Sequence, residues 1–424
     1  MGEFFMSSPD IITLGCRLNI AESEAIKQAL TDKDGSQDLI VVNSCAVTSR
    51  AVAQTRQAIR KASRERPNAR IVVTGCAAQI DPKIFADMPE VSRVIGNVEK
   101  HQAESFAFSG NDEDARIQVT DINSLKETTP HLIAAFSEHS RAFLEIQNGC
   151  NHHCSFCIIP QGRGRNRSAS FDDILDCARK LINNGHQELV LTGVDLTSYG
   201  QDLTSPSNLG ELVAFLLKKL KNLKRLRLSS LDPDGIDPLL MALITEDERI
   251  MPHIHLSLQA GDNTILKRMR RRHSREQAIE LVASLKKRRP EIAIGADIIA
   301  GFPTEDEEMA ANSLRMIDEC DIVFGHIFPY SPRQGTPAAK MPQVHTPLIK
   351  ERAQKLREAA NRRQAEWLKT LVGSRQSVLL EGEGGRGHTP QFAPIRLSEA
   401  VEASGIVDIM VTGTDKDGLI GKKL

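Results

Sequence analysis

The sequence predicts an α/β protein of three parts: an N-terminal α/β domain with a parallel sheet, a central partial (β/α)6 barrel and a small C-terminal all-β barrel. Short runs rich in Ile, Val and Leu alternate with helical stretches, first before residue 104 and again after residue 138, which is typical of parallel sheets. After residue 370 the chain is instead rich in glycine and short apolar runs, which favours a barrel. We therefore expect an N-terminal domain at 8–103, a linker at 104–138, a core at 139–370 and a barrel at 371–424.

Each of the first three apolar runs ends at a cysteine. The runs IITLGC, LIVVNSC and IVVTGC end at Cys16, Cys45 and Cys76. Because the carboxyl ends of parallel strands share one edge of the sheet, where ligands bind, we expect these cysteines to converge. The alternative is three buried cysteines that act as small hydrophobic residues.

The central part contains six apolar runs of strand length, separated by helical stretches. The linker before them is polar and weakly periodic and allows at most one short strand. The expected core strands span 141–147, 188–193, 224–229, 253–258, 292–299 and 322–328. Six β/α units in this length predict an open or partial barrel. A long polar helix at 346–371 ends this part of the chain.

Three more cysteines follow the first central strand. Cys150, Cys154 and Cys157 form C-x3-C-x2-C, and three thiolates on one loop can hold one metal ion or one cluster. A structural zinc site takes four ligands, and His152 or His153 would have to complete it. An iron–sulfur cluster with three protein ligands keeps one iron open for a substrate or cofactor.

The overall charge excludes a globally basic nucleic-acid binder, because 54 Lys and Arg face 55 Asp and Glu. Two local stretches are basic: 267–289 holds ten Lys or Arg and two Glu, and 50–70 holds seven and one. Each predicts contact with a phosphate backbone; the alternative is an ordinary solvated helix face.

No apolar run reaches the ~18 residues of a membrane span, and no signal peptide begins the chain. We therefore expect a cytoplasmic protein with reduced thiols and no membrane contact. The remaining cysteines, Cys177 and Cys320, stand alone in the sequence and are expected in the core.

The combination of motifs resembles the radical S-adenosylmethionine methylthiotransferases, in which a TRAM domain follows a radical core. The motifs are TLGCRLN at 13–19, NSCAVT at 43–48, TGCAAQ at 74–79, NGCNHHCSFCIIPQGRGRNRS at 148–168, LSLQAG at 256–261 and GADIIAGFPTE at 295–305. The resemblance extends over nearly the whole chain and is far more specific than any one motif.

The resemblance implies an enzyme with two [4Fe-4S] clusters and S-adenosyl-L-methionine. It places one cluster on the catalytic cysteines Cys150, Cys154 and Cys157, and a second, at the sulfur-transfer site, on Cys16, Cys45 and Cys76. The open iron of the first cluster would bind the cofactor, whose cleavage gives a radical. A one-electron donor such as flavodoxin or ferredoxin is also implied, and we expect a monomer.

Residues at the strand ends are further candidates for the site. The expected cofactor-binding residues are Gly193 near the methionine amino group, Ser257 and Gln259 near the ribose, and Asp297 within the adenine-side motif. Asp195 and Tyr330 are polar and could line the same site. The alternative for each is a residue that only forms the turn after its strand.

Arg163, Arg165 and Arg167 follow the cysteine loop. Their guanidinium groups are predicted to bind a phosphate or a carboxylate, with a solvated loop as the alternative. Phe392 is the one aromatic residue of the last part, so that part is expected to be a weak platform for stacking bases.

The segments LTGVDLTSYG, RLRLSSLDP and FPYSPRQGTPAAKMP resemble the branch that adds a methylthio group to C2 of N6-threonylcarbamoyladenosine beside the tRNA anticodon. Two other branches remain open, which modify isopentenyladenosine in tRNA or an aspartate of a ribosomal protein. An alternative of another class is a non-enzymatic, metal-containing tRNA-binding protein.

Overall fold

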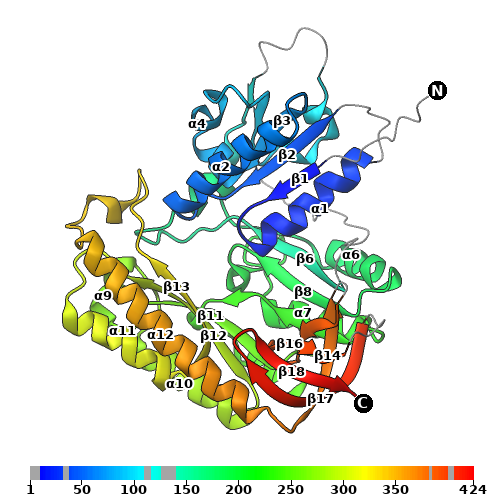
Figure 1. Ribbon diagram of the computed structural model, residues 1–424, viewed down its shortest axis with the longest axis vertical. Helices are drawn as coiled ribbons and strands as arrows, with labels where there is room; N and C mark the ends of the chain where they lie inside the picture. The colour runs from blue at the N-terminus through cyan, green and yellow to red at the C-terminus, as the bar shows by residue number, and fades with distance from the viewer. Residues whose placement is uncertain (1–9, 32–37, 109–115, 126–139, 382–383, 400–404) are drawn as a thin grey trace.

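A computed structural model of the chain describes residues 10–31, 38–108, 116–125, 140–381, 384–399 and 405–424. The start of the expected N-terminal domain and most of the expected linker lie outside these residues. An N-terminal domain lies above a larger core, and a small barrel lies beside the core (Figure 1). The predicted α/β fold class is confirmed.

The N-terminal sheet has five parallel strands in the order β1-β2-β3-β4-β5. The strands are β1 (Asp10–Thr13), β2 (Leu39–Ser44), β3 (Arg70–Gly75), β4 (Arg93–Ile95) and β5 (Ile117–Gln118), and the helices are α1 (Arg17–Thr31), α2 (Ser49–Glu65), α3 (Cys76–Ile80) and α4 (Lys83–Ala86). Strand β2 is buried along its whole length, which explains its continuous apolar run. Strand β5 is the short strand allowed in the linker, and it belongs to this sheet.

The six strands expected in the core are all present, within one residue of their predicted bounds. The strands are β6 (Arg141–Asn148), β7 (Arg167–Ser168), β8 (Glu188–Gly193), β9 (Arg225–Leu228), β10 (Ser230–Leu231), β11 (His253–Gln259), β12 (Ala293–Ala300) and β13 (Ile322–Pro329). The helices are α5 (Ile159–Arg163), α6 (Phe171–Asn183), α7 (Leu209–Lys219), α8 (Pro238–Glu246), α9 (Asn263–Met269), α10 (Arg275–Arg288), α11 (Glu307–Glu319) and α12 (Thr346–Thr370).

These strands form an open arc rather than a closed barrel. One sheet has the order β7-β6-β8-β9 and the other β10-β11-β12-β13. Only Ser229 separates β9 from β10, so the chain passes directly from one sheet to the next. Within the described residues β6 and β13 do not pair, which leaves the partial barrel open on that side.

Alternation along β6 separates the main core from the site. Ala142, Leu144 and Ile146 pack into the main hydrophobic cluster with the helices that follow, so Glu145 and Gln147 face the other side of the sheet. Helix α1 contacts β6 and β8, and the charge of its residue Glu22 reaches Glu145. The N-terminal domain is therefore seated on the face of the arc that lacks outer helices.

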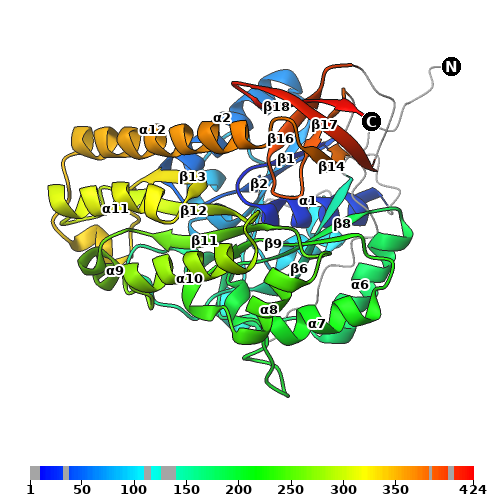
Figure 2. The ribbon, with the colours of Figure 1, turned by 90° about the horizontal axis from the view of Figure 1, so that it is seen from below.

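The C-terminal strands close into a five-stranded barrel in the order β14-β15-β16-β18-β17. They are β14 (Arg375–Glu381), β15 (Arg386–His388), β16 (Pro394–Leu397), β17 (Gly405–Asp415) and β18 (Gly418–Lys423). Helix α12 runs toward this barrel (Figure 2), and Leu368 near its end joins the barrel core. Arg225 at the start of β9 donates to the Ser377 carbonyl over 2.6 Å, which ties the barrel to the core. Among the described helices, none is both long and apolar enough to cross a membrane.

Candidate functional site

The three N-terminal cysteines lie together at the carboxyl edge of the sheet. Gly15 has a φ of +108°, and a Cβ there would lie 2.8 Å from the Cys45 Cβ, so only glycine lets the Cys16 turn approach Cys45. Burial raises the pKa of Cys45 to about 11, and the nearby Cys76 and Cys16 sulfurs add to the shift. The structure thus brings Cys16, Cys45 and Cys76, here called the N-terminal set, to one place.

A buried ion network supports the N-terminal set. Arg163 donates its Nε–H to the Cys76 sulfur over 2.9 Å, and its two terminal nitrogens bind both oxygens of Glu22. Lys100 binds the same carboxylate over 2.7 Å. Burial opposes ionisation of Glu22, but Arg163 and Lys100 outweigh it and hold the pKa of Glu22 well below its usual range. These charges lie directly beside a candidate cluster ligand.

The three arginines after the cysteine loop lie in different environments. Arg163 binds a carboxylate as expected, but it is the chain's own Glu22, so Arg163 is not free for phosphate. Arg167 folds back and donates to the carbonyls of Arg163 and Arg165. Of these three arginines, Arg165 is the exposed one.

The second set of cysteines, here called the loop set, is Cys150, Cys154 and Cys157. Cys150 Sγ accepts the His152 N–H over 3.3 Å, and Arg271 Nη1 lies 3.7 Å from Cys154 Sγ. Burial raises the pKa of Cys150 to about 12 and that of Cys157 to about 11. The free thiols of Cys150 and Cys157 are therefore protonated at neutral pH and become thiolates when they bind a metal. Three close sulfurs with N–H donors fit a cluster that takes three cysteine ligands.

A competing set of metal ligands lies beside the loop set. Cys150, His152 and Asp195 offer one ligand atom each within 4.8 Å, and His152 Nε2 is 2.8 Å from Asp195 Oδ2. This set would suit zinc, but it leaves Cys154 and Cys157 unused. His153 is not part of it.

The two sets of cysteines face each other across the domain boundary. Helix α5, which begins two residues after Cys157, contacts α3, which begins at Cys76. A Cβ on Gly162 would lie 3.4 Å from the Cys76 Cβ, and Asn97 donates to the Gly162 carbonyl over 2.6 Å. The Cys76 sulfur is also among the groups that raise the pKa of Cys157. One short segment therefore connects both sets.

A pocket opens between the two domains at this boundary, with an empty volume of ≈ 660 Å³. Its walls come from the ends of core strands, the cysteine loop and the turn after Cys45: Val47, Thr48, Phe156, Gln259, Asp297, Ile299, Phe328, Pro329, Tyr330 and Ser331. Of the four expected cofactor-binding residues, it includes Gln259 and Asp297. The Tyr330 hydroxyl is buried and has no hydrogen-bond partner among the described residues, so it is available to a ligand.

The other two expected cofactor-binding residues lie outside this pocket. Gly193 packs on Gln147, whose carbonyl oxygen would be 2.8 Å from a Cβ at this position. Ser257 uses its carbonyl to accept from Arg271 over 2.7 Å. Both remain at the carboxyl ends of their strands, β8 and β11.

Asp297 is held by two histidines from neighbouring strands. His255 Nε2 lies 3.0 Å and His326 Nδ1 3.3 Å from its Oδ1 atom. Burial opposes ionisation of Asp297, but these contacts outweigh it and hold the pKa of Asp297 below its usual range. The cost of placing a carboxylate among apolar neighbours is thus offset by its partners.

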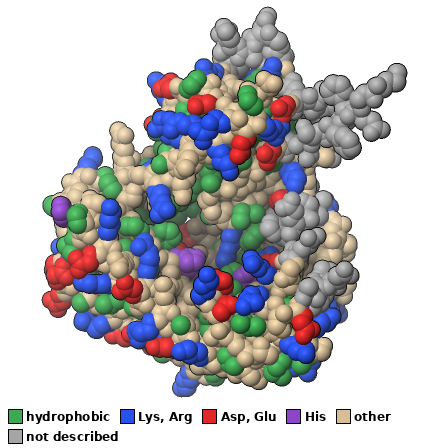
Figure 3. Space-filling view, viewed as in Figure 1, with side chains coloured by type: hydrophobic (Ala, Val, Ile, Leu, Met, Phe, Trp, Pro, Cys, Tyr) green, Lys and Arg blue, Asp and Glu red, His purple; other side chains and the backbone are tan. Residues whose placement is uncertain are grey.

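The molecule is hollowed between the N-terminal domain, the core and the barrel, with His, Lys and Arg side chains along the wall (Figure 3). Phe392 of the barrel stacks on His388 and on His253 of the core, at centroid distances of 4.5 and 5.1 Å. The single aromatic residue of the barrel sequence predicts a weak stacking platform and does not indicate this stack. No local pattern could reveal it, because His253 joins only when the barrel docks on the core.

The two basic stretches differ in how many of their charges are free. Arg56 and Arg64 of α2 are exposed and make no ion pair with a described residue. In 267–289 five cations have acidic partners: Arg271–Asp232, Arg272–Asp234, Arg275–Glu319, Lys286–Asp321 and Arg289–Glu291. The field of this second stretch is therefore weaker than its composition indicates. Cys177 and Cys320 are buried in the core as expected.

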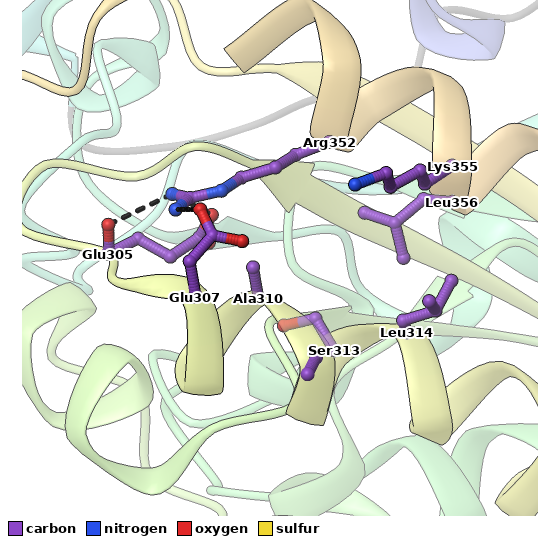
Figure 4. A pocket seen from close by; sticks show the side chains of 9 residues that line it. Glu305, Glu307, Ala310, Ser313, Leu314, Arg352, Lys355 and Leu356 are labelled. Atoms are coloured by element: carbon purple, nitrogen blue, oxygen red, sulfur yellow. Dashed lines mark hydrogen bonds and ion pairs between the residues drawn. The ribbon is translucent and has the colours of Figure 1, made fainter. Parts of the chain in front are cut away.

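A separate pocket of ≈ 480 Å³ lies between α11 and α12. Arg352 of α12 points toward Glu305 and Glu307 across it and binds them over 3.1 and 2.6 Å (Figure 4). The guanidinium is already paired, so this cluster fastens α12 to the core rather than offering a charge to a ligand.

Comparisons with known proteins distinguish between the zinc and iron–sulfur interpretations. Residues 144–317 match the Radical SAM superfamily, and residues 9–96 match "Uncharacterized protein family UPF0004". A threonylcarbamoyladenosine tRNA methylthiotransferase MtaB of Rickettsia prowazekii is 45% identical over 96% of this chain and 95% of its own length. The chain belongs to the radical S-adenosylmethionine methylthiotransferase family. A tRNA-2-methylthio-N(6)-dimethylallyladenosine synthase of Acetivibrio thermocellus is 32% identical over 87% of this chain and 80% of its own.

A solved structure supports the fold of this methylthiotransferase. The radical S-adenosylmethionine methyltransferase TsrM of Kitasatospora setae matches with a TM-score of 0.56 at 15% identity, over 79% of this chain and 77% of that one. The chain is therefore an enzyme that uses S-adenosyl-L-methionine and [4Fe-4S] clusters. The non-enzymatic alternative is wrong.

Proposed function

We propose that this methylthiotransferase adds a methylthio group to C2 of N6-threonylcarbamoyladenosine beside the anticodon of tRNA. The substrate is supported by the relative of that printed name, which is 45% identical over 96% of this chain. The reaction is supported by one feature of the structure: α5 and α3 hold the loop set and the N-terminal set against each other. A substrate base between them would meet both sets.

Each cluster has a proposed set of ligands. Cys150, Cys154 and Cys157 hold one, and Cys16, Cys45 and Cys76 hold the other. Bound there, the clusters and S-adenosylmethionine would supply the radical chemistry by which a methylthio group replaces a hydrogen atom of the substrate.

The surrounding residues position the cofactor and the N-terminal set. Gln259, Asp297 and Tyr330 line the pocket that receives S-adenosylmethionine, and Gly193 and Ser257 approach it from the ends of their strands. Arg163 fixes the Cys76 sulfur through its Nε–H. Because Arg163 and Glu22 are fully buried as a pair, they also keep water from this side of the site.

The electron is proposed to come from an acidic one-electron carrier such as flavodoxin or ferredoxin. An open pocket of ≈ 520 Å³ exposes Cys154 beside Arg270, Arg271 and Arg272. Arg271 and Arg272 pair with Asp232 and Asp234, so the exposed Arg270 is the cation that favours an acidic partner. We further propose that the protein is a cytoplasmic monomer and that its closed barrel is a TRAM domain. The proposed limits remain 8–103, 104–138, 139–370 and 371–424.

Mass spectrometry of tRNA nucleosides tests the reaction and the substrate together. Cells that lack the gene should lose the methylthio derivative of threonylcarbamoyladenosine, and the wild-type gene should restore it. Loss of the isopentenyl derivative instead would move the enzyme to the neighbouring branch. No change in any methylthio nucleoside would contradict a tRNA substrate.

Single cysteine variants test the two sets. Cys45→Ala should keep about four of roughly eight irons per chain, still cleave S-adenosylmethionine and fail to restore the nucleoside. Cys154→Ala should lose the cleavage as well. Cys177→Ala, a buried cysteine outside both sets, is the matched control and should restore the nucleoside. Methylthio transfer by Cys45→Ala would contradict the proposed ligands.

A further inference from the structure

Arg17 is a charged side chain that has no ion-pair partner among the described residues. It follows Cys16 directly and begins α1. Its guanidinium lies 5.6 Å from the Phe392 ring, so it faces the hollow between the N-terminal domain, the core and the barrel. The side chain is partly buried, yet within the described chain it makes no hydrogen bond or ion pair.

The acidic groups around Arg17 are already engaged. Glu381 accepts from Arg141 over 2.7 Å, and Glu188 accepts from Arg227 over 2.9 and 3.0 Å. Arg225 lies 3.8 Å from the same Glu188. These two carboxylates therefore already interact with three arginines other than Arg17.

Asp297 is the next acid near Arg17, and two histidines hold it. Arg141 and Arg227 are further cations close to Arg17 and repel its guanidinium. An anion entering the hollow would remove this repulsion and gain charge-assisted hydrogen bonds.

Resting on the proposed function, we infer that Arg17 binds the carboxylate of the threonylcarbamoyl group and so selects this nucleoside over isopentenyladenosine. C2 and C6, the atom that carries N6, belong to the same six-membered ring of the purine. A group that holds the N6 substituent must therefore lie near the place where C2 reacts, and Arg17 is the residue next to Cys16. A guanidinium is also the side chain best suited to grip a carboxylate with two parallel hydrogen bonds.

The position of Arg17 favours a carboxylate on the base over a backbone phosphate. Its guanidinium lies 5.6 Å from the Phe392 ring and close to Asp297 of the S-adenosylmethionine pocket. A base that is extruded from the RNA enters such a pocket together with its substituent. Phosphates have exposed cations elsewhere, such as Arg56 and Arg64 on α2. An isopentenyl group has no charge and would leave Arg17 unpaired.

Two stem-loop RNAs test the inference, one with threonylcarbamoyladenosine and one with its carboxamide, which lacks the negative charge. The wild-type enzyme should methylthiolate the acid about 10- to 100-fold more efficiently in kcat/KM, the worth of a charged hydrogen-bonded pair. Arg17→Gln should bring this ratio close to one. Arg17→Lys, which keeps the charge but not the paired donors, should give an intermediate ratio.

Arg56→Gln is the matched control, because it removes one exposed cation of the same domain. This variant should lower kcat/KM equally for both RNAs and keep the wild-type ratio of the two kcat/KM values. If Arg17→Gln kept the wild-type ratio of kcat/KM values, the inference would be overturned. An equal fall in kcat/KM for both RNAs would also overturn it, because it would indicate a contact with a backbone phosphate. If the wild-type enzyme used isopentenyladenosine RNA and neither of these two, the proposed substrate itself would be wrong.

Discussion

Replacing Arg163 with Met should loosen the boundary between the N-terminal domain and the core. The side chain is 2% exposed and donates to Cys76 over 2.9 Å, to Asn19 over 2.7 Å and to both oxygens of Glu22. Breaking a buried pair by removing one partner costs about 3–5 kcal/mol. Because Lys100 still binds Glu22, we expect the lower end, about 3 kcal/mol.

Hydrogen exchange of the metal-free, reduced protein measures this cost where it arises. Amides of α1 and α3 should exchange about 100-fold faster in Arg163→Met, while those of the barrel should not change. The effect should be largest above pH ~4.3, the ordinary pKa of Glu. The folded pKa of Glu22 lies below that value, so the stabilisation is present above it and is lost as the pH falls toward the folded pKa.

Arg165→Met serves as the control for Arg163→Met. Arg165 lies two residues away in the same loop but is exposed, and such substitutions usually change stability by less than about 0.5 kcal/mol. Equal exchange rates in α1 and α3 for the two variants would refute the argument that the buried network joins the domains.

Three further predictions follow from the charges and the pocket. Burial raises the pKa of Glu145 to about 7, so the folded protein keeps a proton that the unfolded chain releases above pH ~4.3. Stability should therefore fall by up to about 3 kcal/mol from pH 4.3 to 7, and Glu145→Gln should flatten that slope in urea unfolding; an unchanged slope would contradict it. Tyr330→Phe should leave the stability unchanged but weaken S-adenosylmethionine binding by about fivefold in calorimetry, the worth of one hydrogen bond; equal affinity would remove Tyr330 from the site. Arg56→Glu with Arg64→Glu should weaken tRNA binding and lower the salt dependence of log Kd by about 0.9 per lost phosphate contact, measured by filter binding; an unchanged salt dependence would place tRNA elsewhere.

The parts of the site that the sequence predicts are those that local rules determine. Strand ends follow from apolar runs, and parallel strands bring their carboxyl ends to one edge. The convergence of Cys16, Cys45 and Cys76 needed only these two rules. Gln259 and Asp297 reach the pocket for the same reason, because each lies at or near the end of a core strand.

The contacts that the sequence does not predict depend on how whole domains dock. The sequence predicts that Arg163 binds a phosphate or a carboxylate, but nothing in its loop shows that the partner is the carboxylate of Glu22. Phe392 looked isolated because His253 comes from another domain. Arg17 carried no signal at all, since its meaning depends on which carboxylates other arginines have already taken.

The segment between Cys157 and Arg163 explains how the two sets of cysteines keep a fixed relation. Its first part belongs to the loop set, and Ile158 already packs into the N-terminal core. Gly162 then passes along α3, where an added Cβ would lie 3.2 Å from Ile80 and 3.4 Å from Cys76, and Arg163 binds the Cys76 sulfur. One short segment therefore follows directly from the loop set and contacts Cys76 of the N-terminal set. The distance between the two sets of cysteines is thus determined mainly by the backbone of this segment, and other side chains of the interface add support.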